Sequence, residues 1–267
     1  KTYINRMMRS SVIKKGTWLA SFMLAVCLCA HAEVKLPAIF SDGMVMQQQT
    51  KANLWGTSTP NKKITVTTGW NGKQYAATAD KNGAWQLSVS TPEAGGPYSI
   101  TFNDGSKKTL NNILIGELWL CSGQSNMEMP MKGFKNQPVE NANMDILRSK
   151  NPNIRLFTVK RTSTFTPQTD VVGTWKEATP ANVRDFSATA YYFGRLINEI
   201  LDVPVGLVVA AWGGSACEAW MTADWLKAFP DAKIPQSEAD IKSKNRTPTV
   251  LYNGMLHPLI GMTMKGV

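Results

Sequence analysis

Two nearly continuous apolar runs, at residues 113–121 and 203–212, are the feature of this sequence that most restricts its fold. Apolar runs of this length that end in glycine-containing turns are typical of strands buried on both faces of a parallel sheet. Between the runs, residues 189–201 place apolar side chains at helical spacing. The order strand, helix, strand predicts an α/β layer built on a parallel sheet.

The segment before these runs follows a different pattern. From residue 34 to about residue 112, short stretches alternate apolar and polar residues, as strands with one buried face do. Pairs of turn-forming residues such as Asn-Gly and Asp-Gly separate the stretches, and several strands at this spacing predict a small antiparallel β-sandwich. We therefore predict a β-sandwich accessory domain over residues 33–112, followed by an α/β domain over residues 113–267.

The first 32 residues have the order of a targeting segment. A basic stretch that ends at Lys15 contains no acidic residue and supplies half of the formal net charge of +10. The apolar stretch at residues 18–30 is shorter than the roughly 20 residues that a membrane-spanning helix needs, and small residues follow it. This order predicts a secretory signal peptide at residues 1–32, cleavage near Ala32, export to the periplasm or the extracellular space, and no membrane anchor. The alternative is a buried N-terminal helix.

The residues after the signal peptide exclude several classes of protein. Their Lys and Arg side chains are scattered, without the basic stripe of a nucleic-acid-binding surface. Cys121 and Cys217 are too few for a disulfide scaffold, and with His257 they lack the ligand spacing of a zinc site, so no metal is expected. A disulfide between the two cysteines and two buried free thiols both remain open, because only their geometry decides between them.

Two turns follow the predicted buried strands. Ligands bind at the carboxyl ends of the strands in open α/β sheets, so these turns are the places to look for chemistry. In the first turn, Gly123 permits a tight bend and Ser125 can project an exposed hydroxyl. In the second, Gly213 and Gly214 expose backbone N–H groups. Each turn alone is also an ordinary loop, but together they suggest acyl transfer, with the nucleophile at one turn and an oxyanion donor at the other.

Residues 116–128, with the sequence GELWLCSGQSNME, resemble the signature of the sialate O-acetylesterase family, secreted carbohydrate esterases of the SGNH hydrolase superfamily. The resemblance continues in order through residues 186–194, 205–215 with 218–221, and 251–255. Residues 36–47 resemble the start of the domain that precedes the catalytic domain in this family. It implies an N-terminal antiparallel β-sandwich followed by an SGNH-like, three-layer α/β domain. It also implies an O-acetylated sugar or glycan as the substrate, and no cofactor.

The resemblance assigns roles to five residues of the two turns. It makes Ser125 the nucleophile, with its own N–H as one oxyanion donor. Gly214, or with less support Gly213, provides a second oxyanion donor. Gln124 and Asn126 shape the turn and contact the substrate.

The general base is the part of the mechanism that these residues do not supply. In the family, a Gly-Glu-Ser-Asn type loop and an Asp-x-His type pair follow a strand that begins near residues 264–267. We therefore expect a chain ending at Val267 to lack the C-terminal part of the esterase domain and to hydrolyse esters poorly, because a serine hydroxyl needs a base. For His257 a loop hydrogen bond is favoured over a role as the base.

Two alternatives to a sialate O-acetylesterase remain. One is an acetylesterase acting on plant polysaccharide such as xylan, because related folds carry the same Gly-Gln-Ser-Asn turn. The other is a non-catalytic carbohydrate-binding protein, in which exposed tryptophans stack on sugar rings, although aromatic residues in strands and loops mostly belong to the core. The candidates for such stacking are Trp70, Trp85, Trp220 and Trp225.

Overall fold

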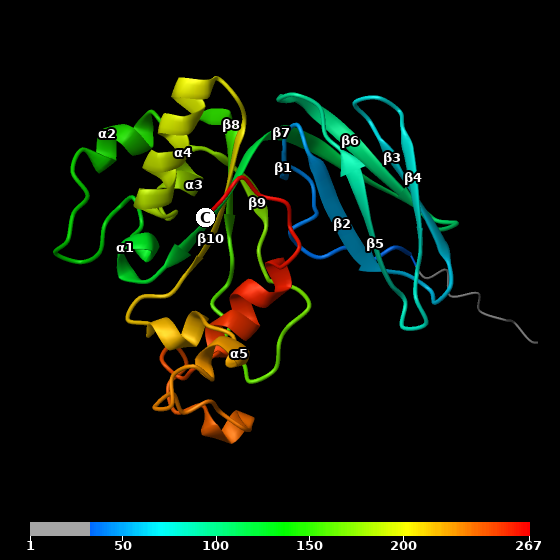
Figure 1. The fold of residues 1–267 in the computed structure, drawn as a ribbon. Helices are drawn as coiled ribbons and strands as arrows, with labels where there is room; N and C mark the ends of the chain where they lie inside the picture. The colour runs from blue at the N-terminus through cyan, green and yellow to red at the C-terminus, as the bar shows by residue number, and fades with distance from the viewer. Residues whose placement is uncertain (1–32) are drawn as a thin grey trace, which may run out of the picture. The chain divides into compact units, whose positions relative to one another are not determined.

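The computed structural model describes residues 33–267, so the predicted signal peptide at residues 1–32 lies outside the described residues (Figure 1). Within the described part, one sheet has eight strands in the order β4-β3-β6-β7-β10-β8-β9, with β1 paired to β7, and a second sheet consists of β2 and β5. The strands are β1 (Val45–Gln47), β2 (Lys51–Thr57), β3 (Lys63–Thr68), β4 (Gln74–Thr78), β5 (Ala84–Ser90), β6 (Gly95–Asn103), β7 (Lys107–Gly123), β8 (Asn151–Thr158), β9 (Trp175–Ala178) and β10 (Val205–Ala211).

The helices are short apart from α4. None that the structure describes has the length and apolar character to cross a membrane. They are α1 (Ser125–Glu128), α2 (Ala142–Leu147), α3 (Pro180–Val183), α4 (Ala188–Leu201), η1 (Cys217–Trp220), α5 (Ala223–Leu226), η2 (Glu238–Asp240), η3 (Tyr252–Leu256) and η4 (His257–Leu259).

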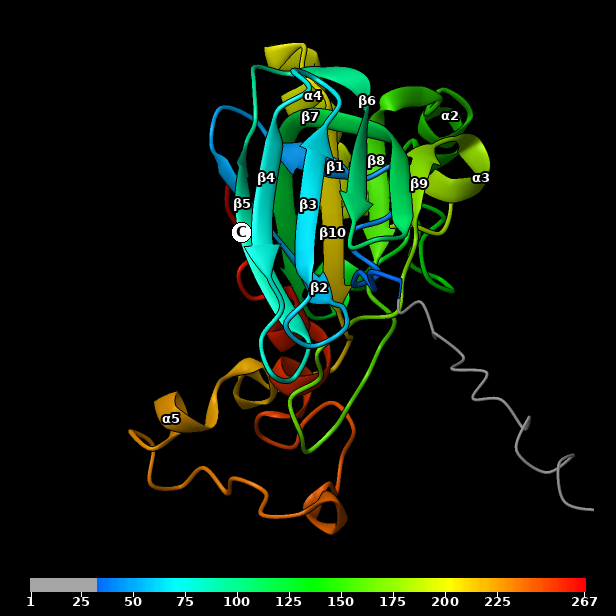
Figure 2. The same cartoon turned by 90° about the vertical axis from the view of Figure 1, so that its right-hand side faces the viewer.

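The N-terminal strands form two packed antiparallel layers. Figure 2 looks onto β4, β3 and β6, which lie side by side, and β2 pairs with β5 in the second layer. Buried and exposed residues alternate along β3, which is the pattern that predicted a strand there. Trp85 of β5 packs against Phe102 of β6 with 5.9 Å between ring centroids, so the apolar faces of both layers share one core.

Strand β7 runs through the predicted domain boundary between residues 112 and 113. Its first part pairs antiparallel with β6, and its last seven residues, 117–123, pair parallel with β10. The described residues accordingly belong to one compact unit, with no linker between the antiparallel and parallel parts of the sheet. The division into domains at residues 33–112 and 113–267 stays a prediction.

Strand β10 separates the two cores of the α/β part. All seven of its residues are buried, as predicted for a strand covered on both faces. Leu207 and Val209 belong to the core under α4, whereas Val208 and Ala210 belong to the core that contains residues 250, 251 and 255 near η3. Helix, sheet and helix thus form three layers, which confirms the predicted α/β class. Figure 1 shows α4 with α2 and α3 on one face of this part of the sheet.

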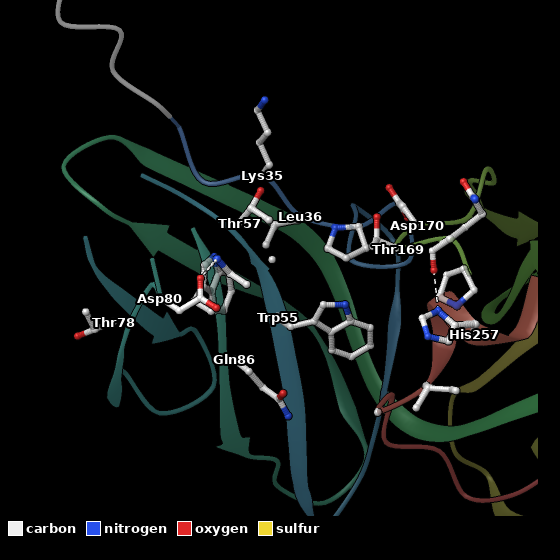
Figure 3. A pocket seen from close by; sticks show the side chains of 18 residues that line it. Lys35, Leu36, Trp55, Thr57, Thr78, Asp80, Gln86, Thr169, Asp170 and His257 are labelled. Carbon is white, nitrogen blue, oxygen red and sulfur yellow. Dashed lines mark hydrogen bonds between the residues drawn. The ribbon is translucent and has the colours of Figure 1, made fainter. Parts of the chain in front are cut away.

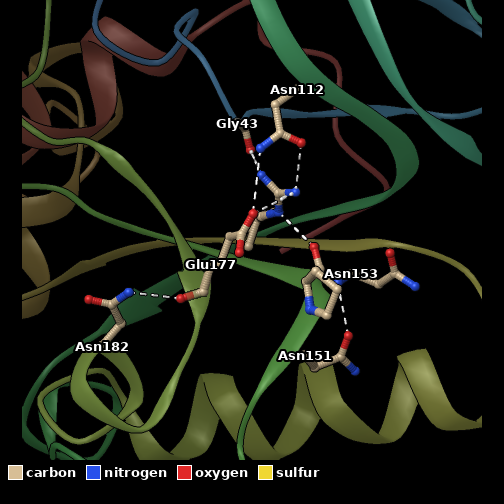
Figure 4. A network of polar contacts seen from close by, with 8 residues as sticks. Gly43, Asn112, Asn151, Asn153, Glu177 and Asn182 are labelled. Carbon is tan, nitrogen blue, oxygen red and sulfur yellow. Dashed lines mark hydrogen bonds and ion pairs between the residues drawn. The ribbon is translucent and has the colours of Figure 1, made fainter.

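A buried arginine of β8 contacts β7, β9 and the loop before β1. Arg155 is 3% exposed, and its guanidinium donates to the Gly43 carbonyl oxygen at 3.3 Å and to Asn112 Oδ1 at 3.0 Å. It also forms an ion pair with Glu177 of β9 at 3.3 Å (Figure 4). Burial lowers the pKa of Arg155, and these partners offset the loss of hydration of its charge.

The carboxylate of Asp145 joins helices α2 and α4, and this contact should make the stability of the fold depend on pH. Asp145 of α2 accepts hydrogen bonds from Tyr192 Oη at 2.7 Å and from an Arg195 guanidinium nitrogen at 2.9 Å. These two hydrogen bonds, that of Tyr192 first, lower the pKa of Asp145. The ionised carboxylate therefore stabilises the fold above its unfolded-state pKa of about 4, and the stabilisation is lost as the pH falls through the lower folded-state pKa.

We expect Asp145→Asn to lower the free energy of unfolding by about 1 kcal/mol at pH 7, a value that allows for partial exposure of the pair. The difference from the parent chain should narrow as the pH falls below about 4. Urea unfolding at pH 7 and pH 3 measures both values. Asp224→Asn is the control, because Asp224 is 84% exposed beside Lys227 and should give no measurable change. An Asp145→Asn effect of equal size at both pH values would contradict the assignment.

Candidate active site

The two predicted turns lie side by side at one edge of the sheet. Gly123, the last residue of β7, pairs with Ala211, the last residue of β10. The Trp212 N–H donates to the Gly123 carbonyl oxygen at 3.2 Å, so the turns are joined directly after the strands end. The structure therefore brings Ser125 and the Gly213-Gly214 pair together, as the carboxyl-end rule for parallel strands predicts.

Ser125 is the first residue of α1, just beyond the end of β7. Its side-chain hydroxyl donates to Gln124 Oε1 at 3.1 Å, in a part of the turn that is open to solvent. The Gly214 N–H donates to the same Gln124 oxygen at 3.2 Å. One acceptor oxygen is thus held between the predicted nucleophile and a predicted oxyanion donor.

The two glycines of the second turn are used differently. Gly214 has φ +70°, a conformation that glycine adopts without strain, and its N–H faces the Gln124 and Ser125 side of the turn. The Gly213 N–H donates instead to Glu128 Oε2 at 2.9 Å. Sequence reasoning assigned no role to Glu128, although it lies in the quoted signature three residues after Ser125. The assignment of the oxyanion donor to Gly214 or Gly213 stays a prediction.

Asn126 connects the serine turn to α4. Its side chain is exposed, and its carbonyl oxygen accepts from Thr189 Oγ1 at 3.1 Å. Because α4 packs on β10, this contact holds the turn against the rest of the α/β layer. A contact of Gln124 or Asn126 with substrate stays a prediction.

His257 lies on a cavity that does not include the serine turn. Its Nδ1 is 2.7 Å from the Gln168 carbonyl oxygen, which is the loop hydrogen bond favoured for it from sequence. The cavity has a volume of about 710 Å³ and is lined by residues that include Trp55, Asp170 and His257 (Figure 3). Ser125, Gly213 and Gly214 are not among the lining residues.

The four candidate stacking tryptophans have different environments. Trp85 is 3% exposed and belongs to the core, which removes it as a sugar-stacking residue. The indole N–H of Trp70 donates to the Ser90 carbonyl oxygen, and that of Trp220 donates to Ser215 Oγ. Of the four, Trp225 is the most open, with 69% exposure.

The two described cysteines are both free, so the open alternative of a disulfide between them is not realised. Cys121 is buried in β7, whereas Cys217 is exposed, which corrects the alternative that both thiols are buried. Burial raises the pKa of Cys121 to about 11. In residues 33–267, no three His, Cys, Asp or Glu side chains are grouped as metal ligands would be.

We expect iodoacetamide at pH 8 to alkylate Cys121 at least roughly 100-fold more slowly than Cys217, because a thiol of that pKa is only ~0.1% thiolate and is also shielded. Digestion and mass spectrometry of the quenched time points measure the two rates separately. In the urea-unfolded chain the two rates should converge. Equal rates in the folded chain would contradict the burial of Cys121.

Comparisons with known proteins support the resemblance. Residues 115–252, about half of the chain, match the family described as carbohydrate esterase, sialic acid-specific acetylesterase. The sialate O-acetylesterases of Pongo abelii and Homo sapiens are each 30% identical over 254 residues, covering 87% of this chain and 47% of their own length. The chain therefore spans about half the length of these relatives.

A solved structure is also similar. The crystal structure of a carbohydrate acetylesterase from Xanthomonas citri is 35% identical, with a TM-score of 0.77, and the match covers 88% of this chain and 50% of that one. The segment that matches the family contains both turns described above. The predicted resemblance is confirmed, and this chain belongs to the sialic acid-specific acetylesterase family of carbohydrate esterases.

Proposed function

We propose that this chain provides the nucleophile and an oxyanion donor of a serine esterase that removes O-acetyl groups from sialic acids. The observation that carries the proposal is the position of Gln124 Oε1, 3.1 Å from Ser125 Oγ and 3.2 Å from the Gly214 nitrogen. An acyl-transfer site needs a position about 3 Å from both the nucleophile and an oxyanion donor. The amide oxygen of Gln124 occupies such a position, where the carbonyl oxygen of an acetyl ester would replace it.

The proposed reaction has two steps. Ser125 Oγ attacks the acetyl carbonyl carbon, and the N–H groups of Gly214 and Ser125 stabilise the negative oxygen of the tetrahedral intermediate. Collapse of the intermediate breaks the bond to the sugar oxygen, which leaves as a hydroxyl after protonation, and forms acetyl-Ser125. Water then attacks the acetyl group, releasing acetate and restoring the serine hydroxyl.

The proton of Ser125 needs an acceptor during the first step. The Nδ1 atom of His257 is paired with the Gln168 carbonyl oxygen, and Ser125 does not line the cavity that His257 lines. We propose that the base belongs to an Asp-x-His type pair, as the resemblance implies. Neither His31 nor His257 has an Asp two residues before it, so activity tests use the full gene product.

Export is part of the proposal. The basic stretch that ends at Lys15, the apolar residues 18–30 and the small residues before Glu33 support secretion of the protein after cleavage near Ala32. An exported esterase would meet O-acetylated glycans outside the cytoplasm.

The substrate class is tested by acetate release from two kinds of acetyl ester. We expect kcat/KM for O-acetylated N-acetylneuraminic acid to exceed that for acetylated xylo-oligosaccharides by at least about tenfold, equivalent to about 1.4 kcal/mol of transition-state binding. Coupled enzymatic detection of acetate measures both. A preference for the xylo-oligosaccharides would favour the xylan acetylesterase alternative, and no release from either would contradict the esterase proposal.

A further inference from the structure

Residues that follow three neighbouring strands of the sheet meet at one carboxylate, that of Glu128. β7, β10 and β8 are adjacent and parallel, so their carboxyl ends meet at one edge. Glu128 follows β7, Gly213 follows β10 and Arg161 follows β8. Glu128 Oε2 accepts the Gly213 N–H at 2.9 Å, and Glu128 Oε1 forms an ion pair with the Arg161 guanidinium.

The carboxylate is enclosed by these partners. The Glu128 side chain is 16% exposed, so it depends on them to offset the loss of hydration. The Arg161 guanidinium also lies over the Trp212 ring, 5.7 Å from its centroid, and so contacts the residue just before the glycine pair. A Cβ at Gly213 would overlap Glu128 Oε2, and it would lie 3.7 Å from Ser125 Cα. Only glycine allows the carboxylate to pack this closely against the turn.

The turn is held from its other side as well. Asn245 Nδ2 donates to the Gly213 carbonyl oxygen at 2.9 Å, and an Arg246 guanidinium nitrogen donates to the Gly214 carbonyl oxygen at 3.2 Å. With Glu128 on its N–H, Gly213 is fixed at both of its backbone polar groups. The Gly214 N–H is the one left facing the serine, where it meets Gln124 Oε1.

We propose that Glu128, supported by Arg161, is a positioning residue that fixes the second turn so that the Gly214 N–H serves as the oxyanion donor. This inference rests on the proposed function, because it gives Glu128 a role in the same acyl transfer. Among the described residues, the hydrogen bonds of its carboxylate do not include Ser125 Oγ, and it acts through the Gly213 peptide. The charge of Glu128 makes that contact a strong hydrogen bond.

The kinetic consequence is specific. An oxyanion donor contributes mainly in the transition state, so misplacing it lowers kcat more than it raises KM. We expect Glu128→Ala to lower kcat roughly 10- to 100-fold, less than outright removal of a donor, with KM changed less than about threefold. Glu128→Gln keeps an acceptor oxygen for the Gly213 N–H and should restore most of kcat. Glu140→Ala is the matched control, because Glu140 is an exposed glutamate and should leave kcat unchanged.

The hydrogen bond between the Gly213 N–H and Glu128 can also be measured without an activity assay. Trp55-Gly56 and Trp212-Gly213 are the two Trp-Gly pairs of the sequence. Labelling Trp with ¹³C at the carbonyl and Gly with ¹⁵N in the 267-residue chain therefore leaves two signals in a carbonyl-filtered NMR spectrum. Gly56 lies in β2 and reports whether the variant is folded. In Glu128→Ala the Gly213 amide proton should move upfield and exchange with solvent at least about tenfold faster, while Gly56 stays in place.

The two readouts together decide the proposal. A changed Gly213 signal, a kcat loss without a matching KM change, and rescue by Glu128→Gln would support it. A Gly213 signal that does not respond to Glu128→Ala, or a kcat that does not fall, would overturn it. Should Glu128→Ala lose the Gly56 signal, Glu128→Gln carries the test: its uncharged acceptor should still move the Gly213 amide proton upfield, and an unchanged Gly213 signal would overturn the proposal. Ser125→Ala is measured in parallel, and retained activity there would overturn the proposed function itself, whatever Glu128 does.

Discussion

Replacement of Ser125 by alanine is expected to lower kcat for acetate release by about 10⁴- to 10⁶-fold, the range found when the nucleophile of a serine hydrolase is removed. The alanine has no oxygen to form the acetyl-enzyme, while the oxyanion donors and the binding surface remain. Ser125 is the first residue of α1, a helix without a buried residue, so the fold should not change. Initial rates of acetate release by the full gene product measure the effect.

A second serine, Ser122 near the end of β7, provides the control. Ser122 Oγ donates to the Ala210 carbonyl oxygen at 2.9 Å, so it serves the pairing of β7 with β10. Ser122→Ala should keep kcat within a few-fold of the parent, since the net contribution of such a hydrogen bond is about 1 kcal/mol of stability. If the protein is a non-catalytic carbohydrate-binding protein, neither Ser125→Ala nor Ser122→Ala should affect its function. Unchanged acetate release from Ser125→Ala would reject Ser125 as the nucleophile.

Replacement of Gly116 by alanine is expected to destabilise the fold by about 3 kcal/mol or more, because the new methyl group has no space. A Cβ at this position would overlap the Pro204 carbonyl oxygen and lie 2.7 Å from the carbonyl carbon. That oxygen accepts the Glu117 N–H at 2.9 Å, and Gly116 is also paired with Gln47 of β1. The backbone cannot move away without breaking the pairing at the start of the parallel sheet.

Urea unfolding with linear extrapolation measures this loss. Gly72→Ala is the comparison, since Gly72 has φ +66° and no atom lies within 4 Å of the place that its new methyl group would take. It should cost only about 1 kcal/mol, for the left-handed conformation. If Gly116→Ala lowers the free energy of unfolding no more than Gly72→Ala does, Gly116 does not pack closely against the Pro204 carbonyl group.

The elements that were predicted well from sequence are those with a local signal. Apolar runs at residues 113–121 and 203–212 became the buried strands β7 and β10, and the helical spacing at residues 189–201 became α4. Each pattern depends on which side chains a single element buries, so it is present in the sequence itself. The extent of β7 was not predictable in this way, because its two halves differ in their partners and so in their burial pattern.

In the candidate site, too, the features with a local sequence signal were predictable and the others were not. Ser125 and the glycine pair were identified from sequence, because a nucleophile turn and an exposed amide turn have recognisable residues directly after a strand. A local pattern cannot separate Gly214 from Gly213, since that depends on the Glu128 carboxylate, which reaches Gly213 from α1. The exposure of Cys217 and the burial of Trp85 could not be predicted either, because they also depend on contacts with other parts of the chain.

By itself, the sequence determined the α/β class, the family and the two turns that carry the proposed chemistry. Only the tertiary structure decided that β7 continues from the antiparallel layers into the parallel sheet, and that Glu128 and Arg161 meet at the Gly213 peptide. The physical reason is that a local pattern records how one element is buried, whereas these contacts join residues that lie far apart in the chain. Their energies depend on distances that exist only after the strands have paired.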